Sequence, residues 1–141
     1  MGRIMAIDYG RKRAGIAVTD ELQIIANALT TVHAKDVFDF LKQYITEETV
    51  EMIVVGEPRQ MNNTASESVR FIDPFVKKLK KVFPDIPVDR FDERFTSKMA
   101  MQAMIDAGIG RKARRDKAAI DKISAVIILQ SYMESRKQNK N

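Results

Sequence analysis

The sequence contains no cysteine and a single histidine, His33. Without cysteine the chain forms no disulfide bond and no thiolate metal site, which fits a reducing compartment. The lone histidine argues against a Ser/His/Asp hydrolase and against a histidine-rich zinc site, so we interpret His33 as a strand-end or loop residue. No uncharged apolar run approaches the ~18 residues of a membrane span, and the amino terminus does not resemble a signal peptide. We therefore expect a soluble, cytoplasmic protein with no membrane partner.

The chain has 141 residues, of which 45% are hydrophobic. This length supports one well-packed core and leaves no room for a second, so we expect residues 1–141 to form a single domain.

Basic residues outnumber acidic ones, with 24 Lys and Arg against 19 Asp and Glu and a formal net charge of +5. They gather in four groups, at residues 11–13, 77–81, 111–117 and 136–140. Such groups suit a polyanion, because each neutralised phosphate releases counterions. The group at 77–81 falls on a predicted helix, where a solvated face is the better interpretation. The group at 111–117 falls in a loop and favours nucleic-acid binding.

The first 33 residues predict three strands. Residues 3–10 and 15–20 are apolar and strand-forming, and the residues between them form a short basic connection, typical of a β-hairpin. Residues 24–33 supply a third strand rich in β-branched residues. Three consecutive strands indicate an antiparallel arrangement.

Helices and strands then alternate. Residues 36–48 have the apolar spacing of a helix, and residues 52–56 form the continuous apolar run of a parallel strand buried on both faces. A loop over residues 56–64 leads to a helix whose apolar stripe is Val69, Ile72, Val76, Leu79 and Phe83. Pro74 lies within this helix and predicts a kink or a break, because proline removes a backbone hydrogen bond.

A fifth strand over residues 88–91 ends in Asp92, Glu93 and Arg94. Thr96 is a suitable N-cap for a helix that ends at Ala107, and residues 117–135 predict a final, largely buried helix. The expected fold is therefore an α/β domain with a mixed five-stranded sheet and helices on both faces.

Three acidic positions stand in places where a purely structural role is unusual. Asp8 lies near the end of the first strand, Glu93 or Asp92 ends the fifth, and Asp121 shares a helix face with apolar residues. If they converge at one end of the sheet, each pair ~4 Å apart repels by ~4 kcal/mol and needs protons or cations. Oxygen ligands select Mg²⁺ or Mn²⁺, and two such ions are the usual means of hydrolysing a phosphodiester. This pattern predicts a nuclease.

Four motifs resemble the YqgF/RuvX family of bacterial nucleases along nearly the whole chain. They are Ile7 to Ala17, Ile53 to Pro58, Asp92 to Thr96 and Asp121 to Gln130. The resemblance implies an RNase H-like fold related to RuvC, with Asp8, Glu93 and Asp121 as the catalytic, metal-binding acids. It also implies maturation of the 5′ end of pre-16S ribosomal RNA, or resolution of Holliday junctions in branched DNA.

We expect the protein to act as a monomer or a homodimer. Basic residues near these motifs are the predicted contacts to nucleic acid. They are Arg11, Lys12, Arg13, Arg94, Arg111, Lys112, Arg114 and Arg115. Three features depart from the family pattern: Glu57 before the proline, the Asn62-Asn63-Thr64 segment, and Pro74 inside a helix.

Three other classes were weighed. Gly10 and Gly15 have the spacing of a phosphate loop, but Ile16-Ala17 stands where Lys-Ser/Thr is required, which excludes a P-loop nucleotidase. Actin-like ATPases share a related fold but need two such domains. A non-catalytic RNA-binding module that keeps the acids for structure is the remaining alternative.

Overall fold

The computed structural model describes residues 2–57, 69–92 and 117–139. Within these ranges the elements are β1 (Arg3–Tyr9), β2 (Arg13–Thr19), β3 (Ala26–His33), the short 3-10 helix η1 (Ala34–Asp36), α1 (Val37–Glu47), β4 (Val50–Glu57), α2 (Val69–Val82), β5 (Val88–Asp92) and α5 (Lys117–Asn139). The helix expected over residues 96–107 lies outside the described residues.

The strands form one five-stranded sheet in the order β3-β2-β1-β4-β5. β1 pairs antiparallel with β2, and β2 pairs antiparallel with β3, as the three consecutive strands predicted. β1 and β4 are parallel, as are β4 and β5. The predicted mixed sheet is confirmed.

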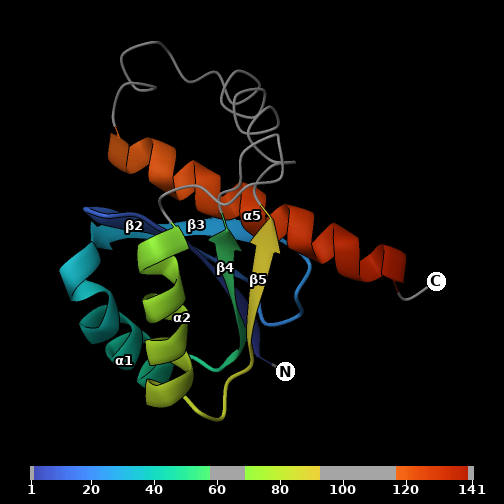
Figure 1. Ribbon diagram of the computed structural model, residues 1–141. Coiled ribbons are helices and arrows are strands. Elements are labelled where there is room, and N and C mark those ends of the chain that lie inside the picture. Colours follow the sequence, from blue (N-terminus) through green and yellow to red (C-terminus); the bar gives the residue numbers. More distant parts are fainter. Residues whose placement is uncertain (1, 58–68, 93–116, 140–141) are drawn as a thin grey trace.

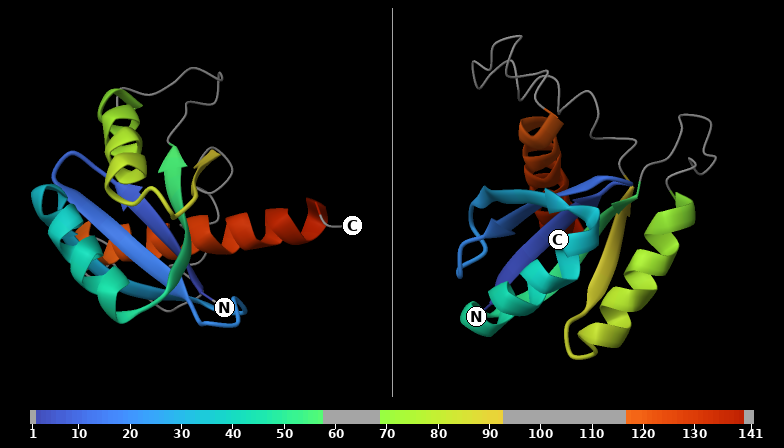
Figure 2. Two further views of the ribbon diagram at one scale, coloured as in Figure 1. Left: turned by 90° about the horizontal axis from the view of Figure 1, so that it is seen from below. Right: turned by 90° about the vertical axis from the view of Figure 1, so that its left-hand side faces the viewer.

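Helices cover both faces of the sheet (Figure 1 and Figure 2). The right-hand view of Figure 2 places α5 on one side and α1 with α2 on the other. One apolar cluster joins the sheet to α1 and α2 and includes Met5, Ile7, Leu41 and Leu79, all fully buried. A smaller cluster joins the opposite face to α5 and includes Ile4, Ala6, Val54 and Ile128. Among the described helices, none is long and apolar enough to cross a membrane.

Some element boundaries differ from the predicted ones for identifiable reasons. β3 begins at Ala26 and not at Ile24, because the backbone N–H groups of Ile24 and Ile25 are bound by the Asp20 carboxylate at 2.7 and 2.8 Å. The break considered at Pro74 does not occur, because proline removes only one backbone hydrogen bond, that to Arg70 near the helix start, and α2 runs over Val69–Val82. α5 continues to Asn139, because no glycine or proline stops it after Ser135.

Candidate active site

The carboxyl ends of β1, β4 and β5 meet at one edge of the sheet, which we call the carboxyl edge. The register pairs Ile7 of β1 with Val55 of β4, and Glu57 of β4 with Asp92 of β5. β1 ends at Tyr9, so its last residues lie level with the end of β4 and, across β4, with the end of β5. In open α/β sheets this edge is where ligands bind.

Asp8 is the acidic residue of β1 at this edge. Successive side chains of a strand point to opposite faces. Ile4 and Ala6 belong to the cluster under α5, so Asp8 also lies on the α5 face. Its side chain is half-buried and takes part in an interaction within the molecule.

Glycines flank Asp8 on both neighbouring strands. Gly15 of β2 is its direct partner in the antiparallel register. On the other side, the β1–β4 register extended by one residue places Gly56 level with Asp8, and Gly56 in turn pairs with Phe91 of β5. Neither strand beside Asp8 therefore carries a side chain next to the carboxylate.

Small residues allow α5 to approach the same face closely. Ala6, Ala17 and Ala125 are fully buried together between the sheet and the helix. Farther along α5, the Tyr132 hydroxyl donates to Asp89 at 3.0 Å, near the beginning of β5. Burial and this hydrogen bond raise the pKa of Tyr132. Because Tyr132 lies over the start of β5, the earlier turns of α5 lie toward the carboxyl edge.

On the opposite face, α2 supports the carboxyl edge. Tyr9 stacks on Phe75 with ring centroids 3.9 Å apart. Arg90 of β5 forms ion pairs with Glu57 at 3.2 Å and with Asp73 of α2 at 2.7 Å. Glu57, one of the departures from the family pattern, therefore has a structural partner in Arg90.

The structure describes only part of the predicted site. Asp8 is at the carboxyl edge, and Asp121 lies within α5, although its side chain is outside the described part. Glu93, Arg94, Arg111, Lys112, Arg114 and Arg115 lie outside the described residues, as do Asn62, Asn63 and Thr64. Among the side chains that are described, no group of three or more His, Asp or Glu residues is placed to hold a metal ion.

Arg11, Lys12 and Arg13 lie at the β1–β2 turn, directly beyond Asp8. Arg13 is the first residue of β2, and its carbonyl accepts a hydrogen bond from the Gly10 N–H at 2.8 Å. A Cβ atom on Gly10 would lie 3.0 Å from that carbonyl oxygen, so the tight turn favours glycine. The predicted basic tip is thus held close to the end of β1.

Sequence reasoning did not identify the two glycines beside Asp8 as parts of the site. Gly15 and Gly56 are visible in the sequence as glycines within apolar strands, a pattern that often marks close approach of a ligand or of another backbone. Their position next to Asp8 follows only from the register.

Comparisons with known proteins agree with this fold. Residues 2–135 match a sequence profile of the RuvX family, described as Holliday junction resolvase. A Phocaeicola vulgatus protein named "Putative pre-16S rRNA nuclease" is 60% identical over 137 residues, covering 97% of this chain and 99% of the relative. A Bacteroides fragilis protein of the same name is 56% identical over 137 residues, and the match again covers 97% of this chain and 99% of the relative.

Solved structures of RuvC from Thermus thermophilus are similar in fold. One, in complex with a Holliday junction substrate, aligns with a TM-score of 0.60 and 16% identity, covering 98% of this chain and 97% of that one. Another aligns with a TM-score of 0.56 and 14% identity, covering 96% of each chain. At these identities the likeness concerns the fold, and it identifies the sheet as RNase H-like.

Proposed function

The chain belongs to the RuvX family, and from this premise we propose that it is a metal-dependent nuclease that hydrolyses phosphodiester bonds of precursor 16S ribosomal RNA in the cytoplasm. The observation that carries the proposal is the placement of Asp8 at the carboxyl edge, between Gly15 and Gly56, on the face covered by α5. A half-buried carboxylate with unoccupied strand positions on both sides is suited to bind a cation or a phosphate group.

Two further acids complete the proposed site. Glu93 directly follows Asp92, the last residue of β5, and β5 ends at the same edge as β1. Asp121 precedes the buried Ala125 by four residues in α5, and residues four apart share a helix face. Both positions support convergence on Asp8, with Asp92 as the alternative ligand to Glu93.

The donor chemistry of these residues fits a hard divalent cation. Asp8, Glu93 and Asp121 supply carboxylate oxygens, and cysteine is absent from the chain. Such a set would hold Mg²⁺ or Mn²⁺, as a pair in the two-metal arrangement. When bound, these ions activate the attacking water and stabilise the leaving oxygen.

The chain's own residues then position the substrate. The glycines beside Asp8 leave space for the reacting phosphodiester, and the three basic residues of the β1–β2 turn attract the flanking phosphates. Arg94 and the basic residues 111–115 are proposed to add phosphate contacts. Holding the backbone on both sides of the bond that is cut supplies most of the orientation that hydrolysis requires.

Branched DNA is the second candidate substrate. The matched family profile carries the description Holliday junction resolvase, and the similar RuvC structure contains such a junction. The relatives of 56–60% identity instead carry the rRNA nuclease name, and we therefore place RNA first.

A direct comparison of substrates tests the proposal. Purified protein is incubated with precursor 16S RNA or with a four-way DNA junction, with Mg²⁺, with Mn²⁺ or with a chelator. We expect metal-dependent cleavage of the RNA near the mature 5′ end and little cutting of the junction. Preferential cutting of the junction would favour the second candidate. Binding of RNA without cleavage under any of these conditions would favour the non-catalytic module.

A further inference from the structure

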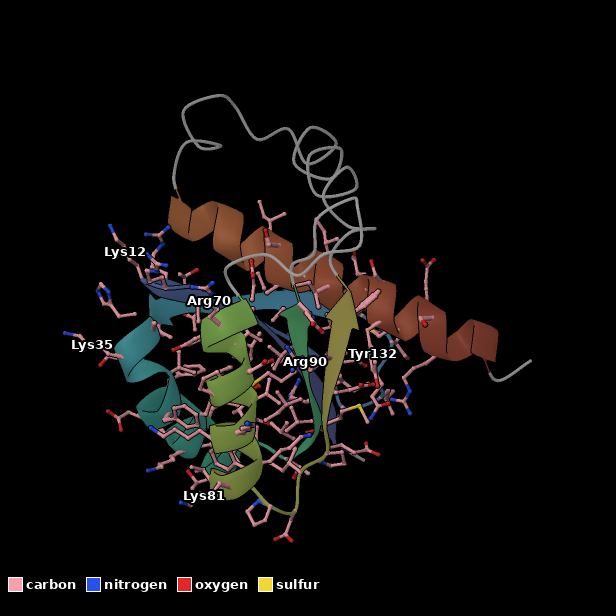
Figure 3. All side chains as sticks on the ribbon, in the orientation of Figure 1. Lys12, Lys35, Arg70, Lys81, Arg90 and Tyr132 are labelled. Atoms are coloured by element: carbon pink, nitrogen blue, oxygen red, sulfur yellow. The ribbon has the colours of Figure 1, made fainter. Side chains whose placement is uncertain are left out.

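A basic pocket lies at the same edge of the sheet, beyond Asp8 and over β2 and β3. It is an open depression with a volume of about 340 Å³, bordered by the β1–β2 turn, the end of β3 and η1. Its lining residues are Arg11, Lys12, Arg13, His33, Ala34 and Lys35. Four of these six are Lys or Arg and one is His, while none of the six is acidic. Figure 3 shows Lys12 and Lys35 at this end of the molecule.

The backbone holds the two halves of the pocket together. The Ala34 N–H donates to the Lys12 carbonyl at 2.9 Å, which joins η1 to the turn. Arg13 and His33 are direct partners in the β2–β3 register. The backbone thus gathers four Lys or Arg side chains and one His around one pocket, and such a set of donors suits an anionic ligand.

The register also relates the pocket to Asp8. Gly15 pairs with Asp8 on one side and with Thr31 on the other, so these three residues form a row across the α5 face. Arg13 and His33 lie two residues farther along β2 and β3, on the same face. From the spacings of residues and strands, their Cα atoms lie roughly 8 to 12 Å from that of Asp8. One nucleic-acid strand that passes Asp8 can therefore also reach the pocket with a nearby phosphate.

We propose that this pocket binds a backbone phosphate of the nucleic acid close to, but distinct from, the phosphodiester that is cut. His33 and Lys35 are binding residues of this subsite, together with the basic residues of the β1–β2 turn. Imidazole and ammonium groups both donate hydrogen bonds to phosphate oxygens. The inference rests on the proposed nuclease function for the position of the cut, and on the pocket itself for the binding of phosphate.

Binding is measured first, in chelator, so that no cleavage occurs. A single-stranded RNA from the 5′ flank of 16S RNA is titrated with wild type, His33→Ala, Lys35→Ala and the double variant. We expect each single change to weaken binding about 3- to 10-fold, and Lys35→Ala to lower the logarithmic salt slope by about one. Lys35→Arg should retain binding. Lys81→Ala, an equal charge change at the far end of the molecule in Figure 3, should bind as wild type does.

The position of the phosphate is then mapped with RNAs that carry one neutral methylphosphonate at successive positions. In wild type, one position near the cut, but distinct from it, should weaken binding. In the His33→Ala/Lys35→Ala variant that position should lose its effect, while the position of the cut keeps its effect. Wild-type affinity and salt slope in the double variant would overturn the proposal. The proposal would also be overturned if inorganic phosphate binds the pocket but the substitutions leave RNA binding unchanged.

These measurements separate the subsite from the proposed function. If wild type cuts no nucleic acid but the variants lose affinity and salt slope, the nuclease proposal fails and the phosphate subsite stands. If wild type cuts RNA and the variants bind it normally, the subsite fails and the nuclease proposal stands.

Discussion

Asp8 has a glycine level with it on each neighbouring strand, and the proposed role of its carboxylate depends on this local arrangement. Gly15 is its direct partner across the β1–β2 pair. In such a pair the Cβ atoms of opposed residues lie about 4.5 to 5.5 Å apart, so any side chain at position 15 would stand beside the carboxylate. In the proposed site, the absence of a side chain at position 15 leaves this position beside Asp8 to a ligand.

Substitutions that fill this space should reduce cleavage in order of size. Gly15→Ala should have a small effect, whereas Gly15→Val should lower the cleavage rate at least about tenfold while the strand is retained, because valine is a good strand former. Cleavage rates and circular dichroism spectra of the two variants provide the measurement. A Gly15→Val protein that is folded and cuts at the wild-type rate would show that the space beside Asp8 is not used.

Asp20 controls the turn between β2 and β3. Its carboxylate accepts backbone N–H groups from Ile25, Ile24 and Leu22 at 2.8, 2.7 and 3.2 Å, and these bonds lower its pKa. Gln23 in the same turn has a φ of 59°, in the left-handed region. The charged carboxylate thus stabilises a turn that includes an unfavourable backbone conformation.

Because the folded-state pKa of Asp20 is lowered, its contribution to stability is present above the unfolded pKa of about 3.9 and is lost as the pH falls through the lower folded value. Asp20→Asn should therefore be less stable than wild type near neutral pH, and the difference should shrink below about pH 4. Denaturant unfolding at a series of pH values measures it. A difference that stays constant from pH 7 to pH 2.5 would contradict the role of the charge.

At the scale of elements, hydrophobic patterns predicted the sheet, its mixed pairing and the three described α-helices, because strand and helix periodicities differ clearly here. The pattern was misleading at Ile24 and Ile25, which are apolar but exposed, since the Asp20 carboxylate draws their backbone into the turn. Asp8 was identified from its place at the end of a strand. Gly56 was not identified, because its position level with Asp8 depends on the parallel register of β1 and β4, two strands that are far apart in the sequence.

The approach of α5 to the sheet is the element-scale feature on which the proposed site depends. Ala125→Leu should force the helix away from Ala6 and Ala17, lower the free energy of unfolding by about 1–3 kcal/mol, and reduce cleavage through displacement of Asp121. Gln130→Leu, an exposed position of the same helix, is the matched control. Equal stability and activity of Ala125→Leu and the control would indicate that close packing of α5 is not required.

At the scale of the molecule, the two faces of the sheet have different roles. The face under α1 and α2 holds the larger apolar cluster, and its stacked Tyr9 and Phe75 and the Arg90 ion pairs support the carboxyl edge. The face under α5 carries Asp8 and the basic pocket, with the partners Arg13 and His33 in the next row. This division places the proposed chemistry and the proposed phosphate contacts on one face of a sheet that is stabilised from the other.

The central claim is that Asp8, Glu93 and Asp121 form one divalent-metal site. Thermal unfolding of wild type, Asp8→Asn, Glu93→Gln and Asp121→Asn, with and without Mg²⁺ or Mn²⁺, tests it most directly. Metal at 100 times its Kd should stabilise wild type by about 2.7 kcal/mol. Each variant should gain much less, and without metal each should be as stable as wild type or more so, because one mutually repelling charge is gone. If metal raises the Tm of wild type and of all three variants equally, the three-acid site does not exist.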